Sequence, residues 1–502
     1  MQKKYFLEQL GCAKNQVDGE TILFALNENS YVQCDDPASA DFIIINSCGF
    51  IESAKQESIN TVLEYKKQFP DKKIILAGCL AKRYEQDLAA SLPEADLLFC
   101  ENDLFKIAAY AERLYSTKHS GGLFREGAGD MPPSLRALSA DIANNENRLS
   151  KDINCNTAKR ASEASPRKNI GNRPLLSFMG SAYIKISEGC NNRCTFCAIP
   201  VIRGNLISRT IADISSEARI LVERGVKELC LVAQDAAAYG MDIAGRCLLD
   251  DLLQELSHID GDFWVRLLYL HPDHFPLEIL QTINSDKRYV PYFDIPFQHA
   301  SETLLNAMNR RGNSKKYLQL IKTIRNNVDN AVMRSTFLTG FPGESEKDFA
   351  ELLEFQANAE LDWAGVFTYS KEDGTPAFSL KNTVPKITAK TRKNMLLEKQ
   401  AEITPARLDR FIGIKTKCLI EEEIDGADCT KGDSENSGKI QENDTADSAG
   451  SIFLGRLFCH APEVDGAAVI CCDDARQRLK CGSFIDVEVF ARANFDFQVR
   501  PN

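Results

Sequence analysis

Three cysteines, Cys190, Cys194 and Cys197, lie close together with the spacing C-x-x-x-C-x-x-C. Three thiolates on one tight loop can bind three of the four irons of a 4Fe-4S cluster, which prefers soft sulfur ligands. The fourth iron then keeps an open position at which a substrate can bind, as catalytic metal sites require. A zinc site is the competing interpretation, but structural zinc usually takes four ligands in paired spacing. The spacing therefore favours an iron-sulfur cluster with an open iron.

A second set of cysteines is dispersed along the first eighty residues. Cys12, Cys48 and Cys79 each follow a predicted strand. In an open parallel sheet, ligands collect outside the carboxyl ends of the strands, so three distant thiols could meet there. Taken singly, each could equally be a small buried apolar residue, and the spacing leaves both possibilities open. The three strands are Tyr5–Leu10, Asp41–Ile45 and Lys73–Ala77.

The chain resembles the methylthiotransferase family of radical S-adenosylmethionine enzymes. The resemblance rests on the first triad and on its context, Glu188-Gly189 before it and Ala198-Ile199-Pro200 and Arg203-Gly204 after it. It implies that the amino and carboxylate groups of S-adenosylmethionine chelate the open iron at Cys190, Cys194 and Cys197. Reductive cleavage would then give a 5′-deoxyadenosyl radical that takes hydrogen from an unactivated carbon.

The dispersed cysteines also lie in segments that are similar to motifs of this family: Gly11–Asn15, Asn46–Phe50 and Gly78–Leu80. The resemblance implies a second 4Fe-4S cluster on Cys12, Cys48 and Cys79. An iron left open there could hold a sulfide or methylthio group for delivery to the substrate radical. The implied cofactors are thus two 4Fe-4S clusters and S-adenosylmethionine.

Four further residues are predicted to bind the cofactor. Gly340, Gly343 and Glu344 follow the predicted strand Ala331–Leu338, where a glycine-rich turn could let backbone amides approach S-adenosylmethionine. The alternative is an ordinary turn before a helix, with Glu344 favoured near the helix N-terminus. Arg334, inside the strand, could pair with a carboxylate of cofactor or substrate.

The family has one branch that modifies an adenosine in transfer RNA and another that modifies an aspartate of the twelfth small-subunit ribosomal protein. Several segments resemble the second branch: Ala233-Gln234-Asp235, Tyr239-Gly240, Asn309–Gly312 and Ala461–Gly466. Ala236-Ala237-Ala238 departs from the polar triplet of that branch. We therefore expect a methylthio group to be added to the β-carbon of the aspartate. Transfer RNA methylthiolation is one alternative, and a non-catalytic iron-sulfur protein is another, although electron transfer usually uses closed four-cysteine ligation.

The pattern of strands and helices predicts an α/β protein with three domains. Residues 1–116 alternate strands with the helices Glu52–Phe69 and Tyr84–Leu92, which favours an open parallel α/β domain. Residues 182–412 hold six βα units, fewer than a closed eight-unit barrel needs, so we expect a partial (βα)6 radical S-adenosylmethionine barrel. The six strands are Ala182–Ile186, Glu228–Ala233, Phe263–Leu270, Tyr292–Ile295, Ala331–Leu338 and Trp363–Tyr369, with helices such as Ile211–Arg224 and Ser314–Asn327 between them.

Residues 413–502 predict five short strands and hence a small antiparallel β-barrel of the oligonucleotide-binding type, which the resemblance implies to be a TRAM domain. This segment carries 17 acidic and 10 basic residues, a net charge of -7. Such a barrel suits a basic ribosomal protein, free or on the small subunit, better than bare RNA. The aromatic-free stretches Arg125–Ser177 and Asp425–Gly450 predict a linker at 117–181 and an insertion at 425–450.

Composition is consistent with a cytoplasmic enzyme. The 502 residues include 17 cysteines, an odd number that favours metal ligation over disulfides in a reducing compartment. No apolar run approaches the ~18 residues of a membrane span, and Glu8 precedes any apolar segment of a secretion signal. We expect a monomer with no membrane partner, while its electron donor and sulfur source have no signature in the sequence.

Overall fold

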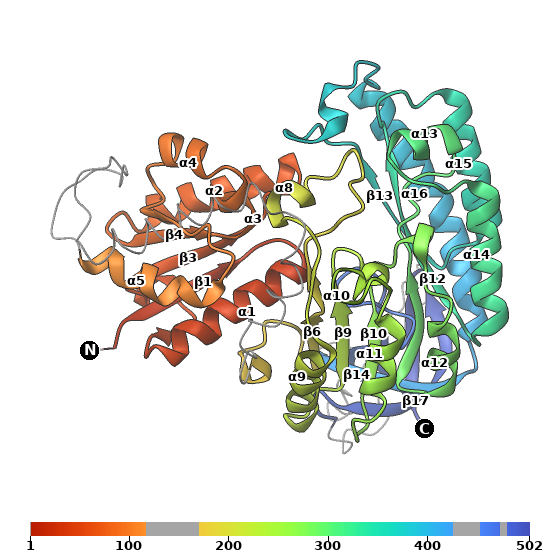
Figure 1. Cartoon of the computed structure of the whole chain (residues 1–502). Helices are drawn as coiled ribbons and strands as arrows, with labels where there is room; N and C mark the ends of the chain where they lie inside the picture. The colour runs from red at the N-terminus through yellow and green to blue at the C-terminus, as the bar shows by residue number, and fades with distance from the viewer. Residues whose placement is uncertain (1, 117–169, 425–451, 472–478) are drawn as a thin grey trace, which may run out of the picture.

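The computed structural model of the chain describes residues 2–116, 170–424, 452–471 and 479–502, which form three domains (Figure 1). The greater part of the predicted linker at 117–181 and the whole of the predicted insertion at 425–450 lie outside these ranges. None of the helices in the described ranges combines the length and the apolar composition that a bilayer span needs.

The N-terminal domain is a five-stranded parallel sheet with the strand order β2-β1-β3-β4-β5, which confirms the predicted open α/β fold. Every residue of β3 is buried, because helices cover both faces of a parallel sheet. The strands are β1 (Lys4–Gln9), β2 (Val32–Gln33), β3 (Phe42–Ser47), β4 (Lys73–Ala77) and β5 (Leu97–Leu98). The helices are α1 (Ala13–Glu28), α2 (Glu52–Gln68), α3 (Gly78–Arg83), α4 (Glu85–Ser91) and α5 (Ile107–Ser116).

The central domain is a six-stranded parallel sheet in chain order, β6-β9-β10-β11-β12-β13. Its edge strands β6 and β13 do not pair, so the barrel is partial, as predicted. The strands are β6 (Ser181–Lys185), β9 (Glu228–Val232), β10 (Trp264–Leu267), β11 (Tyr289–Asp294), β12 (Val332–Thr339) and β13 (Trp363–Thr368). The main covering helices are α9 (Ile211–Glu223), α11 (Leu249–Leu256), α12 (Ile279–Ser285), α14 (Ser314–Asn327), α15 (Glu346–Ala359) and α16 (Lys386–Leu408).

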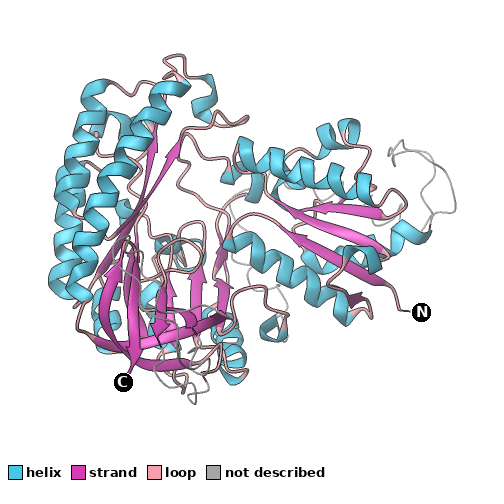
Figure 2. Cartoon of the chain, turned by 180° about the vertical axis from the view of Figure 1, so that it is seen from behind, coloured by secondary structure: helices cyan, strands magenta, loops and turns pink. Residues whose placement is uncertain are grey.

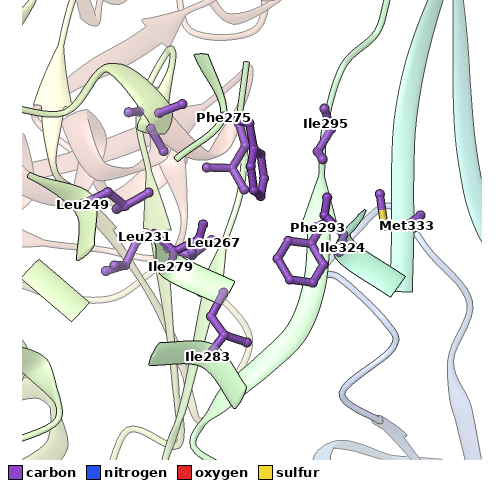
Figure 3. Close-up of a cluster of buried hydrophobic side chains, with 14 of the residues drawn as sticks. Leu231, Leu249, Leu267, Phe275, Ile279, Ile283, Phe293, Ile295, Ile324 and Met333 are labelled. Carbon is purple, nitrogen blue, oxygen red and sulfur yellow. The ribbon is translucent and has the colours of Figure 1, made fainter. Parts of the chain in front are cut away.

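A continuous apolar core joins this sheet to its helices. Leu231, Leu267 and Phe293 of the strands are fully or nearly fully buried beside Leu249, Ile279 and other helix residues (Figure 3). Burying each such side chain contributes on the order of 1.5–3 kcal/mol. The core therefore makes the sheet a rigid support for the loops at the carboxyl ends of its strands.

The C-terminal domain is a closed five-stranded barrel, β14-β15-β16-β18-β17. Its strand pairs are antiparallel except β16 with β18, which is parallel. The strands are β14 (Lys415–Ile424), β15 (Ile452–Arg456), β16 (Ala468–Cys471), β17 (Phe484–Ala493) and β18 (Asp496–Pro501). Buried residues such as Leu419 and Leu457 share one core with Cys230 and Val332 of the central sheet, so the barrel covers the inner face of that sheet (Figure 2).

One segment of the predicted linker is part of the folded structure. Residues 170–177 begin with a short 3-10 helix, Ile170–Asn172, and continue to Arg173, whose side chain is fully buried. Arg173 forms ion pairs with Glu20 of α1 at 2.8 Å and with Glu217 of α9 at 2.5 Å. A polar, aromatic-free composition indicated no core here, but the segment is held by buried charge pairs between the N-terminal and central domains.

Candidate functional site

The dispersed triad lies at the carboxyl edge of the N-terminal sheet. Cys12 directly precedes α1, Cys48 follows β3, and Cys79 lies in the first turn of α3, directly after β4. A Cβ atom on Gly11 would lie only 3.1 Å from the Cβ of Cys48, so the first loop passes directly against the second. The thiols of Cys12 and Cys79 both raise the pKa of Cys48 through charge repulsion, which requires that they lie near it. The fold thus brings the three predicted cysteines to one place.

The three thiols of this triad differ in acidity. Burial raises the pKa of Cys48 to about 11 and also raises that of Cys79. For Cys12, desolvation acts in the same direction, but the charges of Lys14 and Arg203 and the backbone N–H groups of Asn15 and Lys14 outweigh it and lower the pKa. Because metal ligation needs the thiolate, Cys12 is the best prepared ligand of the three.

The local triad lies on the loop between β7 (Ser187–Glu188) and α8 (Ile199–Arg203). The backbone N–H of Cys190 donates to the carbonyl of Gly204 at 3.2 Å, and that of Cys197 donates to Cys194 at 3.0 Å. Thr195 donates to the carbonyl of Met308 at 3.1 Å, which fixes the middle of the loop to the core. These bonds order the loop through its backbone and leave the thiol groups available.

Burial also raises the pKa values of the local triad. The value is about 11 for Cys190 and about 12 for Cys197, and it is raised for Cys194 as well. Arg310 opposes this shift at all three thiols, and its Nη1 lies 4.0 Å from the Sγ of Cys194. A bound metal would deprotonate these thiols outright.

The donor atoms of both triads suit a cluster better than a single ion. In the parts of the chain that the structure describes, no three His, Cys, Asp or Glu side chains converge closely enough to hold one metal ion. In a 4Fe-4S cluster each cysteine binds a different iron, so the ligand sulfurs need not converge on one point. The three thiols of each triad match in number and type the protein ligands that a cluster with one open iron would take.

The two triads are joined through α3 and α8, which lie side by side (Figure 1). Cys79 packs against Ala198 and Ile202, which directly follow the local triad. Arg203 donates from Nη2 to the Sγ of Cys79 at 3.2 Å, while its Nη1 pairs with Asp18 at 2.9 Å. The two predicted sites are therefore neighbours across one domain interface.

A second set of charges holds the same interface. Glu372, which follows β13, pairs with Arg83 at 2.8 Å and with Lys55 at 3.1 Å. Arg83 also donates to the carbonyl of Gly49, next to Cys48, at 2.8 Å. Burial acts to raise the pKa of Glu372, but hydrogen bonds from Ser370, Lys55 and Arg83 lower it. The ionised carboxylate of Glu372 thus connects the central domain to the loop that carries Cys48.

Two of the residues predicted to bind the cofactor have partners within the protein. Glu344 is buried, accepts a hydrogen bond from the backbone of Gly340 and pairs with Arg392 of α16 at 3.1 Å. Arg334 pairs with Asp294 at 2.9 Å. Gly340 has a φ of +78°, and a Cβ there would lie 2.4 Å from that of Ala389. The turn is thus built by Glu344, and contact of these residues with S-adenosylmethionine stays a prediction.

Gly343 completes this group. Its φ is +93°, which disfavours any side chain, and nothing lies within 4 Å of a Cβ placed there. The position that a side chain would take is therefore open, whereas the backbone N–H of Gly343 donates to the carbonyl of Asn382 at 2.7 Å.

Comparison with known proteins gives the family. The model of the "Uncharacterized protein family UPF0004" matches residues 4–100, which contain the dispersed triad, and that of the "Radical SAM superfamily" matches residues 184–355, which contain the local triad. The "Ribosomal protein uS12 methylthiotransferase RimO" of Treponema denticola is 39% identical, covering 97% of this chain and 98% of that protein. The protein of the same name from Acetivibrio thermocellus is 37% identical, covering 99% and 98%. This chain belongs to the RimO family.

A solved structure agrees with the fold of this RimO family member. The radical S-adenosylmethionine methyltransferase TsrM from Kitasatospora setae, solved with cobalamin and a 4Fe-4S cluster bound, superimposes with a TM-score of 0.50. It is 15% identical, and the match covers 75% of this chain and 77% of that chain. At this identity the likeness concerns the fold alone.

Residues that the sequence did not single out hold the site together. In the sequence, Arg203 and Arg310 belong to segments that resemble the family, and Glu372 belongs to no motif. Arg203 is six residues from Cys197 but 124 residues from Cys79, whose sulfur it contacts. One sequence contains no signal for such a long-range pair, so only the folded chain reveals it.

Proposed function

We propose that this chain is a radical S-adenosylmethionine methylthiotransferase that adds a methylthio group to the β-carbon of an aspartate in ribosomal protein uS12. The observation that carries the proposal is similarity over nearly the whole chain to uS12 methylthiotransferases, with both cysteine triads present. The contact between α3 and α8 supports it further, because sulfur insertion must follow hydrogen abstraction at the same carbon.

The two triads take different roles in this proposal. When bound, a 4Fe-4S cluster on Cys190, Cys194 and Cys197 would supply the electron that cleaves S-adenosylmethionine, and one on the dispersed triad would supply the sulfur. The backbone bonds of the 190–197 loop hold its thiols in a fixed arrangement. The turn from Gly340 to Glu344, which is open at the missing side chain of Gly343, is the proposed contact for S-adenosylmethionine, and Arg334 is a further proposed contact.

Substrate choice rests on the relatives more than on the charge of the barrel. Of the net charge of -7 in residues 413–502, the described residues 413–424, 452–471 and 479–502 carry only 8 acidic and 6 basic groups, a net of -2. Residues 425–451 hold 7 acidic and 2 basic groups. The proposed preference for a basic protein therefore depends largely on that insertion. A ribosomal substrate also supports the proposed cytoplasmic location, and we propose a monomer as the active form.

Mass spectrometry of cells that lack this chain tests the proposal. We expect uS12 to lose the mass of one methylthio group on an aspartate, while the transfer RNA methylthio nucleosides stay unchanged. Returning the natural chain should restore the modification, and returning the Cys190→Ala variant should not. Loss from transfer RNA instead would favour the other branch of the chemistry, and loss from neither would leave a non-catalytic iron-sulfur protein.

A further inference from the structure

Arg203 occupies an unusual position between the two cysteine triads. It ends α8, the helix that begins two residues after Cys197, yet its side chain points to the other triad. Its Nη2 lies 3.2 Å from the Sγ of Cys79 and 3.5 Å from the Oδ1 of Asn15. The side chain is only 5% exposed. The buried guanidinium thus contacts a thiol of the neighbouring domain.

The side chain is held in place by two carboxylates. Nη1 pairs with Asp18 of α1 at 2.9 Å and with Glu188 of β7 at 2.6 Å. Lys185 of β6 contacts the same two carboxylates but no cysteine. The two positive charges of Arg203 and Lys185 balance the two negative charges of the carboxylates that they share. Arg203 differs from Lys185 in its directed N–H···S hydrogen bond.

Arg203 and Arg310 each contact a cysteine of a different triad. The Nη2 of Arg203 lies 3.2 Å from the Sγ of Cys79 in the dispersed triad. The Nη1 of Arg310 lies 4.0 Å from the Sγ of Cys194 in the local triad. Each triad thus has its own arginine, and the arginine of the dispersed triad is contributed by the helix that follows the local one.

We propose that Arg203 is a positioning residue that hydrogen-bonds the Cys79 ligand of the dispersed-triad cluster, raises the reduction potential of that cluster and fixes it against the loop of the local triad. This inference rests on the proposed function, which places a cluster on Cys12, Cys48 and Cys79. Hydrogen bonds to ligand sulfurs are among the factors that set the potential of iron-sulfur clusters. Because reduction adds negative charge, an N–H donor stabilises the reduced form more than the oxidised form.

The test compares three variants of the full chain in a background in which Cys190, Cys194 and Cys197 are replaced by Ala, so that only the dispersed-triad cluster is measured. Arg203→Gln removes the charge and the bond to sulfur. Lys185→Gln is the matched control, since it removes one charge from the same group of carboxylates without touching a cysteine. Arg203→Lys keeps the charge but lacks the planar fork that reaches both the carboxylates and the sulfur.

The readout is the midpoint potential of the cluster in an anaerobic redox titration followed by electron paramagnetic resonance. For Arg203→Gln we expect a decrease equivalent to about tenfold in the redox equilibrium, or about 59 mV for a one-electron couple. The decrease should be smaller for Arg203→Lys and smallest for Lys185→Gln. Thermal unfolding of each variant shows whether the protein has remained folded, and if Arg203→Gln does not fold, Arg203→Lys against Lys185→Gln carries the comparison.

Equal decreases for the Arg203 and Lys185 variants would overturn the inference, because they would show that charge alone matters and that the bond to Cys79 contributes nothing. Loss of the cluster in both Arg203 variants with its retention in Lys185→Gln would support the positioning role. A background protein that binds no cluster at all would contradict the proposed function itself. The two failures are therefore distinguishable.

Discussion

The two cysteine triads reach similar chemistry by opposite routes. Cys190, Cys194 and Cys197 lie within eight residues on one loop, which backbone hydrogen bonds tie to the core. Cys12, Cys48 and Cys79 lie on three separate segments, and only the parallel sheet brings their strand ends together. The local triad is therefore specified by spacing, whereas the dispersed triad is specified by topology. The first can be identified from the sequence, and the second depends on the correct fold.

The triads also differ in how their thiols are prepared. All three thiols of the local triad have raised pKa values, because they are buried and Arg310 compensates only in part. In the dispersed triad, Cys12 has a lowered pKa while its two partners have raised ones. Cys12 is therefore the most acidic thiol of its triad in the cluster-free chain.

Cys190→Ala should abolish both reactions. Without this ligand the cluster loses one of its three attachments to the chain, so we expect formation of 5′-deoxyadenosine and methylthiolation of uS12 to fall to background. Liquid chromatography of the nucleoside and mass spectrometry of uS12 measure the two products. Cys34→Ser, at a cysteine outside both triads, is the control and should retain both activities. Continued nucleoside formation by Cys190→Ala would assign the cleavage to another site.

Cys48→Ala should separate the two reactions. The local triad is untouched, so 5′-deoxyadenosine should still form at nearly the natural rate, while methylthiolation of uS12 falls to background. The same two assays give the ratio of the products. If both reactions stopped equally in a folded protein, the division of roles between the triads would be wrong.

Glu372→Gln should weaken the interface that brings the triads together. Breaking a buried ion pair costs about 3–5 kcal/mol, so we expect a lower free energy of unfolding and fewer methylthio groups per 5′-deoxyadenosine. The pKa of Glu372 is lowered in the folded chain, so its stabilising contribution is present above the pKa of an unfolded glutamate and is lost as the pH falls through the lower folded value. Denaturant unfolding at several pH values measures this contribution.

In Glu372→Gln, the free energy of unfolding should therefore lose the part of its pH dependence that Glu372 contributes. Asp373→Asn, at the exposed neighbouring carboxylate, serves as the matched control and should behave like the natural protein. Equal effects of the two substitutions would show that the Glu372 contacts do not hold the interface.

Alkylation of the cluster-free chain should reveal the smallest difference. With its lowered pKa, Cys12 should react with iodoacetamide faster than Cys197, whose pKa is raised to about 12. Between pH 7 and 9 the rate at Cys197 should rise about tenfold per pH unit, because its thiolate fraction does so, whereas the rate at Cys12 should rise less steeply because its pKa is lowered. Peptide mass spectrometry follows both sites. Equal rates and slopes would show that the thiols are not prepared differently.

Much of the fold was predictable because its signals are local. The strands Lys73–Ala77 and Trp363–Thr368 and the helix Ser314–Asn327 agree with the structure to within a residue at their ends, since short apolar runs and a 3.6-residue pattern identify them. Helix α1 was not predicted. It is buried on most sides and carries buried polar residues such as Asn15 and Glu20, so no apolar stripe distinguishes it.

The candidate site was predictable only where chemistry requires a particular residue type. Cysteine is the ligand that such clusters need, so all six cysteines were named in advance, and their role as ligands stays a proposal. The groups that join the triads, Arg203, Glu372 and Arg83, are ordinary charged residues whose partners lie far away in sequence. Glu344 is the opposite case. The sequence predicted it as a cofactor contact, and in the structure its carboxylate binds the backbone N–H of Gly340 and pairs with Arg392.

Counting iron in three forms of the protein tests the central claim most directly. After anaerobic reconstitution we predict about eight irons per natural chain, about four when Cys12, Cys48 and Cys79 are replaced by Ala, and about four when Cys190, Cys194 and Cys197 are replaced. Electron paramagnetic resonance should show that S-adenosylmethionine changes the spectrum of the variant that keeps Cys190, Cys194 and Cys197. It should change the spectrum of the variant that keeps only the dispersed triad less. Four irons in the natural chain, or zinc in place of iron, would contradict the account.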